Sequence, residues 1–103
     1  SSAVTFKTFL SACKAAGRTP IPEDDAVFEW AEGAGIPGEF LRLAWLEFRS
    51  RYGESTKRYK DWRRVFRNAV RDNWFKLWFC NEQGIVCLSN QGRLIQKTHA
   101  EVA

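Results

Sequence analysis

The chain contains no methionine and only one histidine, and its three cysteines form no Cys-x-x-Cys pair. A structural zinc site needs about four Cys or His ligands, so we expect no metal centre. An odd number of cysteines without a secretion signal is typical of a reducing cytoplasm, where we expect Cys13, Cys80 and Cys87 to be free thiols that fill space. The absence of methionine even at position 1 is typical of a fragment, and we expect the chain to come from the C-terminal part of a longer protein.

Long apolar runs and catalytic motifs are also missing. No run approaches the roughly 18 apolar residues that cross a membrane, and the N-terminus has no signal-peptide pattern. There is no glycine-rich phosphate loop and no Gly-x-Ser-x-Gly turn, and His99 has no evident nucleophile partner. The acidic cluster at residues 23–25 would suit a divalent metal, but the dipole at a helix N-terminus explains it as well, and we favour that explanation. We therefore expect a cytoplasmic protein without membrane contact that is not an enzyme and binds no cofactor.

A chain of 103 residues with five Trp, eight Phe and two Tyr is expected to form one packed domain, residues 1–103. The hydrophobic pattern predicts a mainly α fold: a small helical bundle with a C-terminal β-hairpin and a short final helix. The expected elements are helices over Thr5–Gly17, Pro22–Ala31 and Gly38–Tyr52, a long basic helix over 57–76, a hairpin of Phe75–Phe79 and Ile85–Leu88 around Asn81–Gly84, and a helix over Asn90–Ala100 capped by Ser89. The side chains expected to face inward are Phe6, Phe9, Leu10, Cys13, Val27, Phe28, Ala31, Phe40, Leu41, Ala44, Trp45, Phe48, Tyr52, Trp62, Val65, Phe66 and Ala69. The hairpin would also allow Cys80 and Cys87 to face each other across its two strands.

Positive charge is concentrated in the middle of the chain. From Arg42 to Lys76 there are eleven Lys/Arg and four Asp/Glu, a net charge of +7. Residues 1–41 carry three Lys/Arg and six Asp/Glu, and residues 77–103 are neutral, which gives the overall +4. A polarised charge distribution creates a field at one side of the molecule even when the net charge is modest.

The segment 57–78 is strongly amphipathic when it is placed on a helix at 100° per residue. One side then carries Trp62, Val65, Phe66, Ala69, Asn73 and Leu77, and the other carries Lys60, Arg64, Arg67, Arg71, Trp74 and Trp78. Cations that follow phosphates, together with rings that stack on bases, are typical of a nucleic-acid surface. A charged outer face is also the default for any surface helix, so that alternative stays open. Trp74 and Trp78 would alternatively cover the hairpin or the first helix, and for Trp74 we favour this packed position.

The helices on either side of Gly33–Pro37 would also fit a helix-turn-helix, with the hairpin as a wing. The second of these helices directs Arg42, Leu46 and Arg49 outward and offers no Asn or Gln for adenine edges. A helix-turn-helix is therefore the weaker interpretation.

Three stretches of the sequence form a recognisable set. Residues 22–28 read PEDDAVF, residues 41–49 read LRLAWLEFR and residues 61–69 read DWRRVFRNA. From Pro20 to Trp78 the chain thereby resembles the single-stranded-DNA-binding domain of DnaT-type primosomal proteins and related phage replication proteins. Ala69 stands where that family often has an aromatic residue, and the first helix, the hairpin and the last helix lie outside the resemblance. The resemblance implies a helical bundle that binds DNA in a replication or mobile-element setting, with self-association or contact with a helicase or loader.

We therefore expect a nucleic-acid-binding module of a bacterial or phage replication or mobile-element protein, with DNA favoured over RNA and binding that is single-stranded or tolerant of sequence. The alternative is a protein–protein interaction or oligomerisation module, in which the acidic stretch Glu23–Glu32 meets the basic helix of another copy or of a partner. The expected binding residues are Lys57, Arg58, Tyr59, Lys60, Arg63, Arg64, Arg67, Arg71, Trp74 and Lys76, with Tyr59 and Trp74 as the stacking rings.

Overall fold

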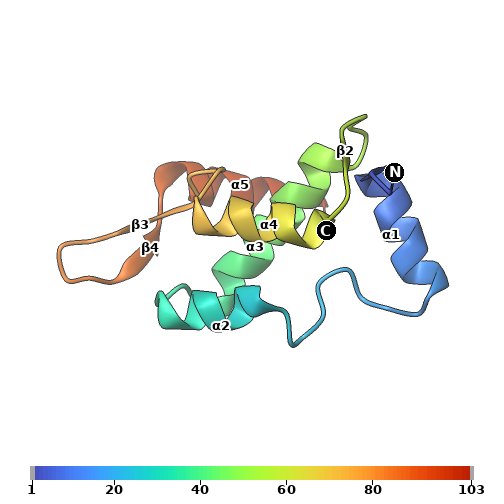
Figure 1. Cartoon of the computed structure of the whole chain (residues 1–103). Coiled ribbons are helices and arrows are strands. Elements are labelled where there is room, and N and C mark those ends of the chain that lie inside the picture. Colours follow the sequence, from blue (N-terminus) through green and yellow to red (C-terminus); the bar gives the residue numbers. More distant parts are fainter. Residues whose placement is uncertain (1, 103) are drawn as a thin grey trace.

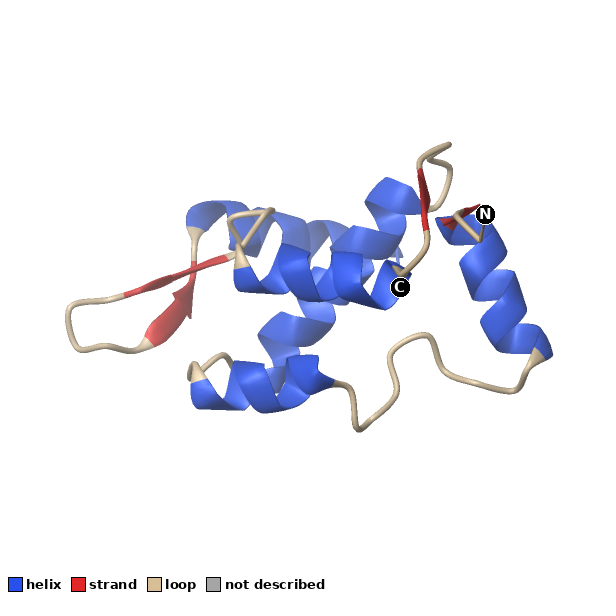
Figure 2. Ribbon diagram, in the orientation of Figure 1, coloured by secondary structure: helices blue, strands red, loops and turns tan. Residues whose placement is uncertain are grey.

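The computed structural model describes residues 2–102, which form five helices and two small two-stranded sheets (Figures 1 and 2). The elements in chain order are β1 (Val4–Thr5), α1 (Phe6–Ala15), α2 (Ala26–Gly33), α3 (Gly38–Tyr52), β2 (Arg58–Tyr59), α4 (Trp62–Arg71), β3 (Trp78–Cys80), β4 (Val86–Leu88) and α5 (Asn90–Val102). The prediction of a mainly α domain with a hairpin before a final helix is confirmed. No helix among the described residues is both long and apolar enough to span a membrane.

The core is an aromatic cluster that joins α1, α3 and α4. Phe6, the first residue of α1, is fully buried. The centroid of its ring lies 5.4 Å from the ring centroid of Phe48 in α3 and 5.1 Å from that of Trp62 in α4. These pairs meet edge to face, which is the arrangement that the charge distribution of aromatic rings favours. Large rings at these positions therefore hold the N-terminal helix against the centre of the chain.

The N-terminus is also joined to the centre through the backbone. Val4 pairs with Tyr59 and Thr5 pairs with Arg58 in the antiparallel sheet of β1 and β2. The indole Nε1 of Trp62 donates a hydrogen bond of 2.8 Å to the carbonyl oxygen of Val4. Thr5 then caps α1 as predicted, since its hydroxyl accepts a hydrogen bond from the Thr8 backbone N–H.

The predicted start of the second helix is wrong by four residues. Pro22 and Asp25 form a turn instead, and α2 begins at Ala26, with the Asp25 carboxylate accepting a hydrogen bond of 2.9 Å from the Val27 N–H. An aspartate with this bond is a strong N-cap, so the last of the three acidic residues sets the helix boundary. Phe28, expected in the core, keeps 41% of its surface exposed.

The basic helix is shorter than predicted at both ends. The Asp61 carboxylate caps α4 by accepting a hydrogen bond from the Arg64 N–H, so residues 57–60 lie before the helix in an extended segment. At the other end Asn73 takes a left-handed conformation with φ 48°, and its side chain binds the Leu77 N–H and the Trp78 carbonyl oxygen. Asn adopts this conformation more readily than most residues, and here it turns the chain towards β3.

The hairpin and the last helix follow the prediction closely. Strands β3 and β4 are joined around Gly84, whose φ of +79° suits glycine, and Ser89 caps α5 through the Gly92 N–H. The register pairs Cys87 with Phe79 and Cys80 with Val86, so the two cysteines do not face each other. All three cysteines are free thiols; Cys13 is buried, Cys87 is half-buried and Cys80 is exposed, so the expectation that all of them fill interior space is wrong for Cys80. The hairpin projects from one end of the helical body, opposite to α1 (Figure 1).

A short hydrogen-bonded chain of side chains holds α5 against α3. His99 Nε2 lies 2.9 Å from Glu47 Oε1, and the Arg51 Nε donates a hydrogen bond of 2.7 Å to Glu47 Oε2. Burial raises the pKa of Glu47, but the hydrogen bonds and charges of Arg51 and His99 outweigh it, so the pKa ends below its usual value. Glu47 is therefore a carboxylate that both helices share.

Candidate nucleic-acid interface

The exposed cations of the central segment lie on two consecutive elements. Lys57, Arg58 and Lys60 belong to the extended segment before α4, while Arg64 and Arg71 point outward from α4 itself; all five are exposed. Asp61 is the one carboxylate in the sequence between residues 57 and 71, and it is the helix cap. The predicted single helical ladder of cations is thus divided between a strand-like arm and a short helix.

Two of the predicted phosphate-binding arginines have structural partners. The Arg63 Nε donates a hydrogen bond of 2.7 Å to the Pro20 carbonyl oxygen, and its guanidinium lies over the Phe9 ring at 5.2 Å. Arg63 therefore joins α4 to α1 and to the linker that follows it. Arg67 forms an ion pair of 2.9 Å with Asp25, whose side chain is only 4% exposed.

Sequence periodicity predicted that Arg67 lies opposite the apolar stripe, and Arg63 was expected to bind phosphates, but both guanidinium groups turn towards the protein. The Arg67 side chain is 28% exposed, and much of its charge is neutralised by Asp25. A paired, half-buried guanidinium attracts a phosphate less than an exposed one does. The exposed set of five cations is therefore a better candidate for phosphate contacts than the predicted ladder.

The two stacking candidates differ in their surroundings. Tyr59 is half-buried in β2, and its ring meets that of Trp62 edge to face at 4.9 Å, at the border of the core. Trp74, in the turn after α4, keeps 42% of its surface exposed, so the favoured packed position under the hairpin is wrong for this ring. Trp78 is half-buried in β3 and packs against the core. Lys76 is exposed in the same turn as Trp74, which places one ring and one cation beyond the end of α4.

The acidic front predicted for α2 is only partly available. Asp25 is buried and paired, whereas Glu23, Asp24, Glu29 and Glu32 are exposed. No cluster of three His, Cys, Asp or Glu side chains suited to a metal ion occurs within residues 2–102. The exposed carboxylates therefore make α2 and the turn before it negatively charged.

The helix-turn-helix interpretation gains little from the structure. Helices α2 and α3 are joined by the short connection 34–37, and α3 exposes Arg42 and Arg49. Leu46, expected on that outward face, is half-buried, and the sequence of α3 contains no Asn or Gln. Two arginines without an amide side chain would contact phosphates more readily than they would distinguish base pairs.

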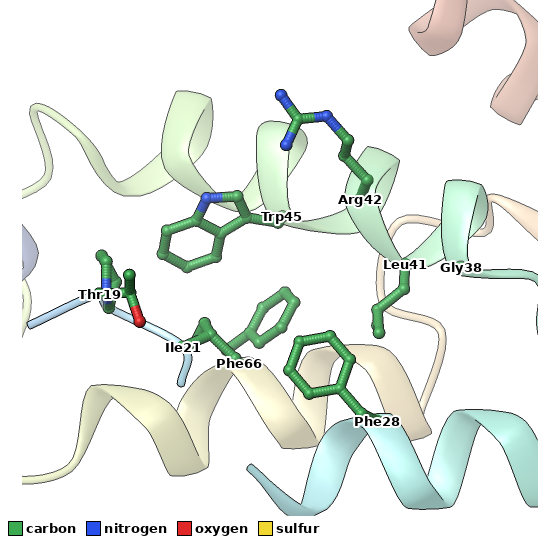
Figure 3. Close-up of a pocket in the computed structure, with 9 residues that line it drawn as sticks. Thr19, Ile21, Phe28, Gly38, Leu41, Arg42, Trp45 and Phe66 are labelled. Atoms are coloured by element: carbon green, nitrogen blue, oxygen red, sulfur yellow. The ribbon is translucent and has the colours of Figure 1, made fainter. Parts of the chain in front are cut away.

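One feature that the sequence did not indicate is an apolar pocket of about 300 Å³ between α2, α3 and the α1–α2 linker (Figure 3). Phe28 and Trp45, both assigned to the core from their spacing, line it together with Phe66, and Arg42 lies at its α3 edge. The pocket is open to solvent at Phe28, which is exposed. A hydrophobic pattern within one helix does not show that a side chain lines a pocket between several segments.

Comparisons with family models, curated proteins and solved structures find no match for this chain.

Proposed function

We propose that the chain is a nucleic-acid-binding module of a bacterial or phage replication or mobile-element protein, and that it binds DNA without strong sequence preference. The observation that carries this proposal is the set of five exposed cations on residues 57–71, a stretch whose one carboxylate caps the helix. Phosphate contacts of this kind supply most of the affinity of sequence-tolerant binding. The resemblance to DnaT-type domains supports DNA as the ligand.

In this mechanism the arm and the helix hold one strand by its backbone. Lys57, Arg58 and Lys60 would contact successive phosphates along the extended arm, and Arg64 and Arg71 would continue the contacts on α4. Trp74, exposed just beyond Arg71, would stack on an unpaired base. An exposed ring adjoining a row of cations favours a single strand over a duplex, because bases in a duplex are already stacked.

The experiment that tests the proposal is a fluorescence-anisotropy titration with labelled single-stranded DNA, duplex DNA and single-stranded RNA over a salt series. The double variant Arg64→Glu/Arg71→Glu should lose at least tenfold in affinity for single-stranded DNA, and its salt slope should fall by about 0.7 per lost contact. A matched control, Lys14→Glu/Lys97→Glu, makes the same change in net charge at exposed positions on α1 and α5. Equal losses in the two double variants would show that only the overall charge matters and would refute the assignment to α4.

The alternative function is self-association or protein binding through opposite charges. It is favoured by the exposed carboxylates Glu29 and Glu32 of α2 and by the exposed ring of Trp30 on the same helix. Sedimentation equilibrium at low and high salt distinguishes the two functions. A dimer that dissociates with salt, together with no DNA binding, would support the alternative and would contradict the main proposal.

A cytoplasmic location belongs to the same proposal. Cys13, Cys80 and Cys87 are all free, as expected of thiols in a reducing compartment.

A further inference from the structure

The apolar pocket between the α1–α2 linker, α2 and α3 has the dimensions and lining of a binding site. Its volume of about 300 Å³ is at the lower end of the range for ligand pockets. Figure 3 shows the rings of Phe28, Trp45 and Phe66 around one hollow, with Ile21 of the linker on the side opposite Leu41 of α3. A hollow bordered by aromatic and aliphatic side chains would gain free energy by burying one large apolar group.

Cations border this pocket on both sides. Arg42 is exposed and lines the pocket from α3. Beyond Thr19, which lines both hollows, Arg18 and Arg63 line a second hollow of about 430 Å³. No Asp or Glu lines either hollow. A ligand with an apolar centre and negative charges on both sides would match this arrangement.

We propose that the pocket binds an acidic segment of a partner protein, with one Phe, Trp or Leu side chain inside and carboxylates towards Arg42 and Arg18. The lining favours an apolar side chain over a nucleobase. A buried base needs hydrogen-bond partners for its ring nitrogens and exocyclic groups, and an unmet partner is costly. The polar side-chain groups of the lining are the Thr19 hydroxyl, the Arg42 guanidinium and the single indole N–H of Trp45, which together offer fewer partners than a buried base needs.

The pocket is separate from the proposed DNA surface. Phe66 reaches the pocket from the buried side of α4, whereas Arg64, two positions earlier, projects about 160° away around the same helix. A bound peptide and a bound DNA strand would therefore occupy different sides of α4. Peptide binding in the pocket does not depend on DNA binding at the exposed cations, so one proposal can fail while the other holds.

The test uses a fluorescein-labelled peptide of aspartates around one central phenylalanine, titrated with the protein. Arg42→Glu and Phe28→Ser should each weaken binding about tenfold or more, because one removes a rim cation and the other an exposed pocket wall. Arg49→Glu is the matched control, since Arg49 is an exposed arginine two turns further along α3 that does not line the pocket. Circular dichroism and melting curves should be the same for all three variants. Peptides with Asn for Asp, or Ser for Phe, should also lose binding.

Three results would overturn the proposal. The first is no binding of the peptide at protein concentrations up to about 1 mM. The second is an equal loss in Arg49→Glu and Arg42→Glu, which would mean diffuse attraction by charge. The third is displacement of the peptide by single-stranded DNA, with a matching loss of DNA affinity in Phe28→Ser, which would make the pocket a base site. The α4 double variant, by contrast, should bind the peptide normally whether or not it binds DNA.

Discussion

Replacing Arg67 by alanine should destabilise the protein more than the same change at Arg64 or Arg71, the two exposed arginines of α4. The Asp25 side chain is only 4% exposed in the parent protein. The change leaves its carboxylate with one remaining hydrogen bond, from the Val27 N–H. Breaking a fully buried ion pair costs about 3–5 kcal/mol, because a charge is left without a partner. The Arg67 side chain is 28% exposed, so water reaches the pair, and we expect a smaller loss of about 2 kcal/mol.

A loss of about 2 kcal/mol is readily measured in a domain of this size. It corresponds to a fall in the melting temperature of roughly 10 °C. The matched control is Arg64→Ala, on the same helix but exposed, which should change the free energy of unfolding by less than about 0.5 kcal/mol. Urea unfolding followed by tryptophan fluorescence gives both values under one set of conditions.

The same pair of variants separates structure from binding. Arg67→Ala, measured at a temperature where it is folded, should retain most of its affinity for single-stranded DNA, and Arg64→Ala should lose more. A double-mutant cycle with Asp25→Asn, which keeps a side-chain oxygen for the helix cap, isolates the energy of the ion pair. If Arg67→Ala melts within about 1 °C of Arg64→Ala, the ion pair contributes nothing and the reasoning is wrong.

Three further predictions follow from single side chains. Trp74→Ala should weaken binding of single-stranded DNA by about 1–3 kcal/mol and leave the melting temperature unchanged, since the ring is 42% exposed; a fall in melting temperature without loss of binding would contradict this. Trp62→Ala should cost roughly 3–5 kcal/mol and unfold or loosen the domain in thermal melts, because the ring is 2% exposed; a folded variant with weaker DNA binding would move Trp62 into the site. The lowered pKa of Glu47 contributes stability that is fully present above the unfolded pKa of about 4.5 and is lost as pH falls through the folded value. The urea midpoint of Glu47→Gln should therefore vary less with pH below 4.5 than that of the parent, and parallel plots of midpoint against pH would refute this.

The sequence predicted best those elements whose boundaries are set by neighbouring residues. The third helix was placed correctly over Gly38–Tyr52 because Pro37 precedes it and Gly53 follows it. The hairpin was predicted because Gly84 supplies the positive φ that its turn requires. In both cases the deciding interaction is local, and a local pattern is enough to find it.

Several of the errors come from contacts between distant parts of the chain. Pairing with Val4 helps to keep Tyr59 in an extended conformation, so helical periodicity did not apply before Asp61. Arg63 and Arg67 bind groups 43 and 42 positions earlier in the chain, which a helical wheel does not show. The pocket depends on three segments at once, so it had no signature in any of them. The sequence therefore identified the segment that carries the exposed cations, but not which of its arginines are paired within the protein.

The contacts of Phe6 have a consequence for the order in which the protein is made. The ring of this residue packs on Phe48 and Trp62, and the strand beside it pairs with Tyr59. A ribosome releases residue 6 well before these partners, so the nascent α1 has its full set of partners only when residue 62 has emerged. The chain between Phe6 and its partners must lose conformational entropy before these contacts form, and this delays the docking of α1 onto α3 and α4. The N-terminal segment should therefore be the last part of the chain to become protected from hydrogen exchange during refolding, and the exposed apolar surface of α1 would be a transient target for chaperones.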